Sequence, residues 1–429
     1  MNRLVAGASL ILIGSLAIEG APRQPPRGPV RAETKAVADQ NGPFNALGAT
    51  LFWGAWGYKF DRERLERNLA SLSEADIDYV RVLGSVGGDS WSDRTVDPRW
   101  PDYDEVVAAF TDLAYDKYGL RVQWTLFGGA PFTPSGRTRE RLVDTFARLS
   151  RGREHKIFAF EIANEASSTG FEGPEGIAEL RRLGARLNNK TSVLVALSDP
   201  AAGEECATYA GARVDATTMH YERGFGKEGA MRPIRGPWSY PTQYDADCRG
   251  QLPPLVFNNE PIGPESSVRQ DDDPARIAAA YVATFLANHA AYVFHAGPGI
   301  RGGGAADVDG SLRRHANFDE LPSFTQIAEA LAAARRYLPP GLANWSRRGP
   351  DHAAAPILGS EHVYSATAGS RFVALVLDVQ QPTKLRARAA SSIVVRDAAT
   401  GRVVKRLKVT AGQTFTLGGY EALVLIGRA

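Results

Sequence analysis

The stretch KIFAFEIANEAS, Lys156 to Ser167, runs from a mostly apolar segment directly into an Asn-Glu pair. A short apolar run of this kind, here Ile157 to Ile162, is typical of a strand that is covered on both faces. Glu165 follows where that strand ends. A surface turn would explain a carboxylate at this position, and so would a catalytic acid at the rim of a barrel. The rest of the sequence must decide between the two.

Seven further segments resemble this strand, and longer amphipathic stretches separate them. The eight predicted strands are NALGATLFW, DYVRVLGS, LRVQWTLFG, KIFAFEIAN, SVLVALSD, DATTMHY, PPLVFNNE and AAYVFHAG. Between them, apolar residues recur every three or four positions, as in helices that cover a sheet. This alternation predicts an α/β fold, a closed (β/α)8 TIM barrel, over residues 44–341. A doubly wound open sheet is the alternative, but no glycine-rich dinucleotide fingerprint follows the first strand.

The pattern changes in the last part of the chain, where strand-like runs such as RFVALVLDV and YEALVLIG alternate with Gly, Asp and Thr turns. No long amphipathic stretch interrupts them. Residues 342–429 are therefore predicted to form a C-terminal all-β sandwich. The segment beyond Arg348 contains no Trp, so structural support is favoured over glycan binding.

The first residues have the pattern of a secretory signal. Arg3 precedes an uncharged, largely apolar run from Leu4 to Ile18, which is short for a membrane span. Residues 1–20 are predicted to be a signal peptide, with an uncleaved anchor as the alternative, and the Pro-rich residues 21–43 a linker. The expected location is secreted or periplasmic, without stable membrane insertion after cleavage.

Charge and cysteine content narrow the range of partners. The formal net charge of this 429-residue chain is only +2, and no segment gathers enough positive charge to suggest a nucleic-acid partner. The two cysteines, Cys206 and Cys248, could form one disulfide in an oxidising compartment or remain two free thiols. Neither has the spacing of a metal ligand, so no metal site is predicted.

Polar and aromatic residues gather at the predicted strand ends, which meet in one mouth of a barrel. These residues are Trp53, Arg81, Asn164, Glu165, His220, Tyr221, Asn259, Glu260 and His295. Strands four and seven, which end in the two glutamates, face each other across an eight-stranded barrel. Cleavage of a glycosidic bond needs such a pair, one carboxyl group protonated and the other ionised. Glu165 and Glu260 are therefore the predicted catalytic residues.

Several motifs resemble those of clan A glycoside hydrolases. FEIANEA is similar to the EIWNEP signature that ends strand four of that clan, and VFNNEPIG stands where the clan carries its nucleophile. DYVRVLGS and TMHY resemble the segments that supply an active-site Arg, and a His with a Tyr. The resemblance implies that Glu165 is the acid/base, that Glu260 is the nucleophile and that Asn164 binds the adjacent sugar hydroxyl. It also implies retention of anomeric configuration, with carboxyl groups about 5–5.5 Å apart.

The sequence also departs from the clan pattern. Ala163 and Ala166 replace a Trp and a Pro of the strand-four motif, and His295 stands where strand eight commonly ends in a Trp. Adjacent residues on a strand face opposite ways, so one of His220 and Tyr221 is expected to reach the site. The expected substrate-binding residues are Trp53, Arg81, Asn164, His220, Tyr221 and His295. Glu161, which lies deeper than Glu165, is interpreted as a structural partner.

The sequence thus predicts an exported retaining glycoside hydrolase that cleaves β-linked oligo- or polysaccharides without a metal or organic cofactor. The sugar, the linkage, endo or exo action and the oligomeric state stay open. Two alternatives remain. The altered motifs would suit a barrel that binds glycans without cleaving them. The run GPGIRGGG after strand eight would suit an isomerase or lyase of a phosphorylated metabolite.

Overall fold

The structure is a computed structural model of the chain. It describes residues 27–129, 131–134, 136–200, 203–220, 248, 250–267, 270–303, 315–350, 352–359 and 362–429. The predicted signal peptide and Tyr221 lie outside these residues.

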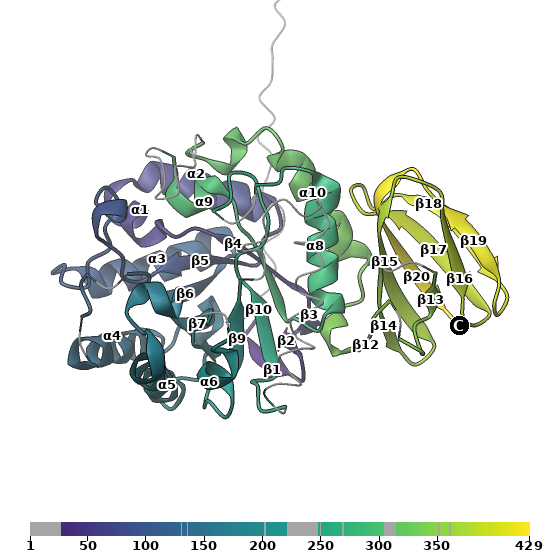
Figure 1. Cartoon of the computed structure of the whole chain (residues 1–429). Coiled ribbons are helices and arrows are strands. Elements are labelled where there is room, and N and C mark those ends of the chain that lie inside the picture. Colours follow the sequence, from purple (N-terminus) through teal and green to yellow (C-terminus); the bar gives the residue numbers. More distant parts are fainter. Residues whose placement is uncertain are drawn as a thin grey trace, which may run out of the picture.

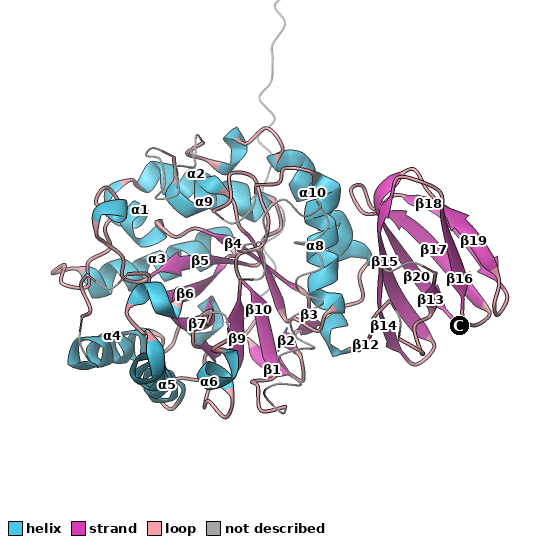
Figure 2. Cartoon of the chain, viewed as in Figure 1, coloured by secondary structure: helices cyan, strands magenta, loops and turns pink. Residues whose placement is uncertain are grey.

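Eight parallel strands close into a barrel, in the order β10-β11-β4-β5-β6-β7-β8-β9. They are β4 (Ala46–Thr50), β5 (Tyr79–Leu83), β6 (Arg121–Phe127), β7 (Ile157–Ala163), β8 (Val195–Ala196), β9 (Ala216–Met219), β10 (Leu255–Asn258) and β11 (Ala291–Phe294). Each coincides with a strand predicted from the sequence, and Figures 1 and 2 show them inside a ring of helices. Closure of the sheet removes the open-sheet alternative.

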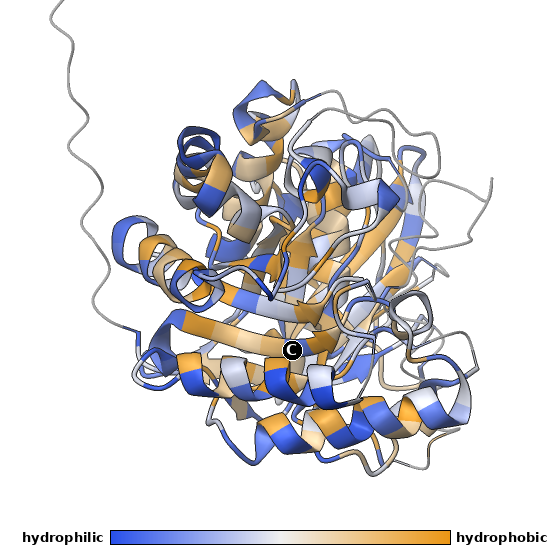
Figure 3. Ribbon diagram, turned by 90° about the vertical axis from the view of Figure 1, so that its left-hand side faces the viewer, coloured by the Kyte–Doolittle hydropathy of each residue, from blue (hydrophilic) through white to orange (hydrophobic). Residues whose placement is uncertain are grey.

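The helices around the barrel are α1 (Gly54–Phe60), α2 (Arg62–Glu74), α3 (Tyr103–Tyr118), α4 (Gly136–Leu149), α5 (Gly173–Asn188), α6 (Glu205–Tyr209), α8 (Pro274–Leu286), α9 (Gly297–Arg301) and α10 (Phe324–Tyr337). Figure 3 shows the outer helices with hydrophilic residues on one side and hydrophobic residues on the other. In α5, for example, Ile177, Leu180, Leu183 and Leu187 are buried. Their spacing of three or four residues puts them on the face that covers the sheet. Burial of this face is what fixes the helix on the barrel.

The expected linker over residues 21–43 is wrong from Arg31 onward. Residues there form a three-stranded antiparallel sheet of β1 (Arg31–Glu33), β2 (Ala36–Asp39) and β3 (Gly42–Phe44). All four residues of β2 are buried, and Val37 packs in one cluster with residues that begin the barrel strands. The apolar AVA triplet, hidden among Pro and charged residues, thus covers the N-terminal end of the barrel.

Aromatic side chains fill the barrel beneath this sheet. The rings of Tyr79 and Phe158 stack with centroids 3.8 Å apart and planes within 3° of parallel. Gly48 makes room for them, since a Cβ there would lie 2.4 Å from the Tyr79 ring. In the pairing of β6 with β7, Val122 faces Ile157 and Gln123 faces Ala159, so Phe158 is an extra residue in β7. The bulge accounts for the presence of Phe158 at this level.

The C-terminal residues form the predicted sandwich. Its larger sheet contains β12 (Ser346–Arg348), β14 (Val363–Ala368), β15 (Arg371–Val379), β20 (Tyr420–Arg428), β17 (Ser391–Asp397) and β18 (Val403–Val409). The smaller sheet contains β13 (Ile357–Leu358), β16 (Thr383–Ala387) and β19 (Thr414–Leu417). Alternate residues of β15 face opposite ways: Phe372 and Val376 pack between the sheets, while Val373 and Leu375 join the core of the barrel domain. Helices α8 and α10 lie between the barrel and the sandwich (Figure 1).

A disulfide bond links two segments of the barrel domain. Cys206 in α6 and Cys248 form a disulfide, with Cα atoms 5.1 Å apart and a separation of 42 residues in the sequence. Of the two alternatives that the sequence left open, a disulfide or two free thiols, the structure shows the disulfide.

Within the described residues, no helix has the length and apolar character that a membrane span requires.

Candidate active site

Arg81 connects the strands at the C-terminal end of the barrel. Its side chain is fully buried at the third position of β5. Nε donates to Oε2 of Glu161 at 2.9 Å, Nη1 to Oε1 of Glu260 at 2.9 Å, and Nη2 to Oδ1 of Asn164 at 2.8 Å. Burial alone would lower the pKa of Arg81, but the two carboxylates raise it overall. The guanidinium therefore stays charged and holds three side chains in fixed positions.

Glu161 is a structural partner, as the sequence predicted. It is fully buried on β7 and accepts from Arg81 and from Oγ1 of Thr125 at 2.5 Å. Its other oxygen accepts from Nδ2 of Asn259 at 3.1 Å. All its contacts are therefore inside the barrel wall, where they fix the arginine and the residue before Glu260.

Glu260 follows β10 and is only 1% exposed. One of its oxygens accepts from Arg81, and Oε2 lies 3.5 Å from Nδ1 of His220 and 3.9 Å from Nε2 of His295. An arginine charge this close stabilises the ionised form of a carboxyl group. The surroundings of Glu260 thus favour an ionised carboxylate that is shielded from water.

Glu165 lies on the opposite side of the site at the start of η3 (Ala166–Thr169). Its φ of +46° is uncommon for a residue other than glycine. The turn is held by bonds from the backbone N–H groups of Ser168 and Thr169 to the carbonyl of Glu165. The side chain is 22% exposed. A carboxyl group at this position can exchange its proton with solvent, whereas the carboxyl group of Glu260 is covered.

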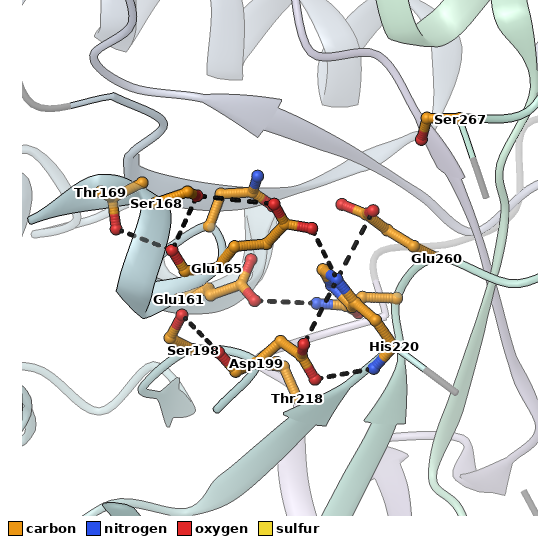
Figure 4. A network of polar contacts seen from close by, with 12 residues as sticks. Glu161, Glu165, Ser168, Thr169, Ser198, Asp199, Thr218, His220, Glu260 and Ser267 are labelled. Carbon is orange, nitrogen blue, oxygen red and sulfur yellow. Dashed lines mark hydrogen bonds and ion pairs between the residues drawn. The ribbon is translucent and has the colours of Figure 1, made fainter. Parts of the chain in front are cut away.

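His220 lies between the two glutamates. It follows β9, and its buried ring places Nδ1 3.4 Å from Oε1 of Glu165 and 3.5 Å from Oε2 of Glu260. One ligating atom from each of these three residues lies within 4.8 Å of the others. Figure 4 shows Glu165 and Glu260 pointing toward one another beside His220. Glutamates that are 95 positions apart in the sequence are thus brought into one small space.

Among the described residues, Glu165, His220 and Glu260 are also the group of possible metal ligands whose atoms lie close enough together to hold a cation. The guanidinium of Arg81 already lies 2.9 Å from one oxygen of Glu260. A metal ion would have to share that carboxylate with a fixed positive charge, so the donor set suits an ion pair better than a metal centre.

Asp199 is a site residue that sequence reasoning missed. It follows β8, and its Oδ1 accepts from the backbone N–H of His220 at 2.8 Å, while Oδ2 lies 3.7 Å from Nδ1 of the same residue. Burial raises the pKa of Asp199 to about 7, although His220 opposes this shift. The available signal was the same as for Glu165: a carboxylate that directly follows an apolar strand.

Two other predicted site residues, His295 and Trp53, are buried at different places in the barrel domain. His295 is fully buried behind Glu260, with Nδ1 2.8 Å from Oγ1 of Thr50 and Nε2 2.8 Å from Oγ of Ser267. Trp53 is fully buried as well, and its indole N–H donates to the carbonyl of Pro298. Its expected role in substrate binding is wrong, because a ring inside the hydrophobic core offers no face to a sugar. Of the pair His220 and Tyr221, the first reaches the site and the second lies outside the described residues.

The glycine run after β11 serves close packing. A Cβ on Gly299 would lie 1.8 Å from the carbonyl oxygen of Thr50, and one on Gly297 would lie 2.6 Å from Cβ of Glu265. The helix α9 has only five residues, and the carboxylate beside it would repel a phosphate. The described part of the run therefore gives no support to the phosphate-binding alternative.

Neither a family model nor a curated protein matches the sequence. Solved structures do match. A glycoside hydrolase superposes with a TM-score of 0.68 at 14% identity, over 94% of this chain and 97% of its own. The chain shares the fold of this structure. A family 5 glycoside hydrolase from Bacteroides vulgatus gives a TM-score of 0.66 at 14% identity over 94% of both chains.

This likeness confirms the resemblance to clan A at the level of the fold. An α-galactosidase I from Mortierella vinacea also matches, with a TM-score of 0.51 at 12% identity over 90% of this chain and 96% of its own. A protein named for cleavage of an α-linkage therefore shares the architecture as well. The reaction has to be argued from the side chains, and not from the fold.

Proposed function

We propose that the protein is an exported retaining glycoside hydrolase that cleaves β-glycosidic bonds of an oligo- or polysaccharide. The observation that supports this most is the approach of Glu165, His220 and Glu260: one oxygen or nitrogen atom from each residue lies within 4.8 Å of the other two. Retaining enzymes need their two carboxyl groups about 5–5.5 Å apart, whereas inverting enzymes need room for a water, about 6.5–9.5 Å. The short separation favours direct attack by a carboxylate.

In the first step, an oxygen of Glu260 bonds to the anomeric carbon while the bond from that carbon to the leaving oxygen breaks. Glu165 gives its proton to the leaving oxygen. The assignment rests on environment: Glu260 is 1% exposed and paired with Arg81, as suits a nucleophile that must be ionised and shielded from water. Glu165 is partly exposed, as suits a group that meets the leaving group.

In the second step, Glu165 takes a proton from water as that water attacks the anomeric carbon, and the ester to Glu260 breaks. Glu165 is then protonated again, as it was at the start, with a proton that came from water. His220 is close enough to hydrogen-bond with either glutamate as the charge moves from one to the other. Asn164, oriented by Arg81, is assigned to the sugar hydroxyl beside the reacting carbon.

The proposal of export has its own support. The N-terminal sequence has the pattern of a secretory signal, and the disulfide between Cys206 and Cys248 is of the kind that persists in oxidising compartments. Expression of the full chain with fractionation of cells and medium would test it. Recovery of uncleaved chain in the cytosol alone would contradict export.

The reaction is tested with matched panels of aryl α- and β-glycosides and polysaccharides. We expect hydrolysis of a β-glycoside, loss of activity in Glu165→Ala and Glu260→Ala, and recovery of Glu260→Ala by azide, which replaces the missing nucleophile. Glu74→Ala serves as the control, because Glu74 is exposed at the C-terminal end of α2 and the helices of such a barrel end on the side away from the mouth. Equal activity of all variants would refute the assignment. Binding of glycans without hydrolysis of any substrate would favour the non-catalytic alternative.

A further inference from the structure

Asp199 brings a third carboxylate to the proposed catalytic pair. Its main chain holds the turn of Glu165, because the backbone N–H of Ala166 donates to the carbonyl of Asp199 at 3.3 Å. Its side chain holds His220 through the backbone N–H of that residue at 2.8 Å. Figure 4 shows Asp199 beside His220, with Glu165 and Glu260 on the other sides of the ring. One residue thus contacts the elements that carry the acid/base and the histidine.

A single nitrogen of His220 is shared by three carboxylates. Nδ1 lies 3.4 Å from Oε1 of Glu165, 3.5 Å from Oε2 of Glu260 and 3.7 Å from Oδ2 of Asp199. The guanidinium of Arg81 also lies 2.9 Å from Glu260. Three negative charges this close repel one another strongly when the site is shielded from water, so one of them is expected to keep a proton.

We propose that Asp199 is a positioning residue for the general acid, sharing one proton with Glu165 across Nδ1 of His220. This rests on the proposed function, because it concerns the acid of that reaction. When the proton moves, the O–H bond of Asp199 breaks as an N–H bond forms at Nδ1. That N–H bond then breaks as an O–H bond forms at Oε1 of Glu165. The site thus retains a donor proton at neutral pH that an isolated glutamate would lose.

The titration of Asp199 agrees with this arrangement. Burial raises its pKa to about 7, the carboxylates of Glu165 and Glu260 add to the shift, and His220 opposes it. Among the described residues, the titratable groups that act on it are Glu165 after β7, His220 after β9 and Glu260 after β10, and Arg81 acts through Glu260. In a coupled pair the last proton belongs to both carboxyl groups. Above about pH 7 that proton is lost, and with it the general acid.

The test compares Asp199→Asn with Asp215→Asn in the full chain. Asp215 is the matched control: it is at the N-terminal end of β9, its Oδ2 accepts from the backbone N–H of Val195 at 2.9 Å, and burial also raises its pKa. The readout is kcat/KM against pH for aryl β-glycosides whose leaving groups either need protonation or do not.

We expect the alkaline limb of the wild type to have a midpoint near pH 7. In Asp199→Asn that limb moves to lower pH by one unit or more, so that activity at pH 7.5 falls about tenfold. Substrates with leaving groups that depart without a proton lose much less, and Asp215→Asn behaves as the wild type. A merely structural role would lower the rate for both kinds of substrate without moving the limb.

The inference is overturned if Asp199→Asn keeps the wild-type limb while Glu165→Ala and Glu260→Ala are inactive. If those two variants are fully active, the proposed function itself has failed. Should Asp199→Asn not fold, carboxyl NMR of the wild type replaces it. An aspartate signal with a midpoint near pH 7, which moves to lower pH in Glu165→Gln, would support proton sharing. An unchanged midpoint in that variant would contradict it.

Discussion

The two ends of the barrel are built in opposite ways. At the N-terminal end, Tyr79 and Phe158 stack inside the strands, and β2 covers them with buried Val37. At the C-terminal end, Arg81 is fully buried among Glu161 and Glu260. The first arrangement is the ordinary way to stabilise a barrel, by removing apolar surface from water. The second removes charges from water, which is costly and is compensated only by close pairing.

The difference shows where stability and function reside in this chain. Aromatic stacking at the closed end requires only that the rings fit. A buried charge network at the open end requires each donor and acceptor to be in place, and its charges are those that the proposed reaction uses. Substitutions at the closed end should therefore change stability, and substitutions at the open end should change activity first.

The largest effect is expected for Glu260→Gln. The amide keeps the shape of the side chain but removes the attacking oxygen anion, so kcat should fall by at least about 10³-fold. The melting temperature should not decrease, because Arg81 keeps its buried ion pair with Glu161 while one buried negative charge is removed. Kinetics with the best aryl glycoside and thermal unfolding of the same preparation give the two readouts. A Gln variant that unfolds readily and keeps its activity per folded molecule would reverse the comparison.

The next effect is expected for Arg81→Met, which leaves two buried carboxylates without their partner. Removal of one member of a buried ion pair costs about 3–5 kcal/mol, and activity should be lost as well. Denaturant unfolding measures the first and kinetics the second. Arg81→Lys keeps the charge but cannot bond Glu161, Glu260 and Asn164 at once, so it should restore stability more than activity. Equal recovery of both would contradict the positioning role of the guanidinium.

At the closed end, Phe158→Ala should lower the free energy of unfolding by about 3 kcal/mol, because it deletes a stacked ring and leaves a cavity. The activity per folded molecule should be unchanged. Denaturant unfolding and active-site titration separate the two quantities. Phe60→Ala is the control, since Phe60 is 56% exposed. Loss of activity without loss of stability in Phe158→Ala would show that the ends are not independent.

The smallest effect at neutral pH concerns His289, a fully buried residue before β11 at the closed end. Burial lowers its pKa to about 3. Below about pH 6.5 the unfolded chain therefore binds a proton on His289, whereas the folded chain binds it only near pH 3. Stability from this site is complete above pH 6.5 and falls by about 1.4 kcal/mol per unit as the pH drops toward 3. Unfolding of His289→Gln should show a smaller acid loss than the wild type, whereas exposed His352→Gln should not. Equal slopes would contradict this.

The sequence predicted the barrel, the sandwich and most of the polar network, because strand periodicity fixes which residues lie at the strand ends. It did not place Trp53, since a tryptophan after a strand has the same pattern whether its ring faces the mouth or the helices. Asp199 was overlooked because an Asp before a Pro is also a common turn. β2 was interpreted as part of the linker because its short apolar triplet AVA stands among Pro and charged residues.

The proposed reaction requires Glu260 to form a covalent bond to the sugar. The direct measurement is incubation with activated 2-deoxy-2-fluoro-β-glycosides, which slow hydrolysis of the ester, followed by mass spectrometry of the intact chain and of its peptides. We expect one sugar per chain, attached to the peptide that contains Glu260, and no adduct in Glu260→Gln. A label on Glu165 or Asp199, or inversion of configuration with a substrate that is turned over, would contradict it.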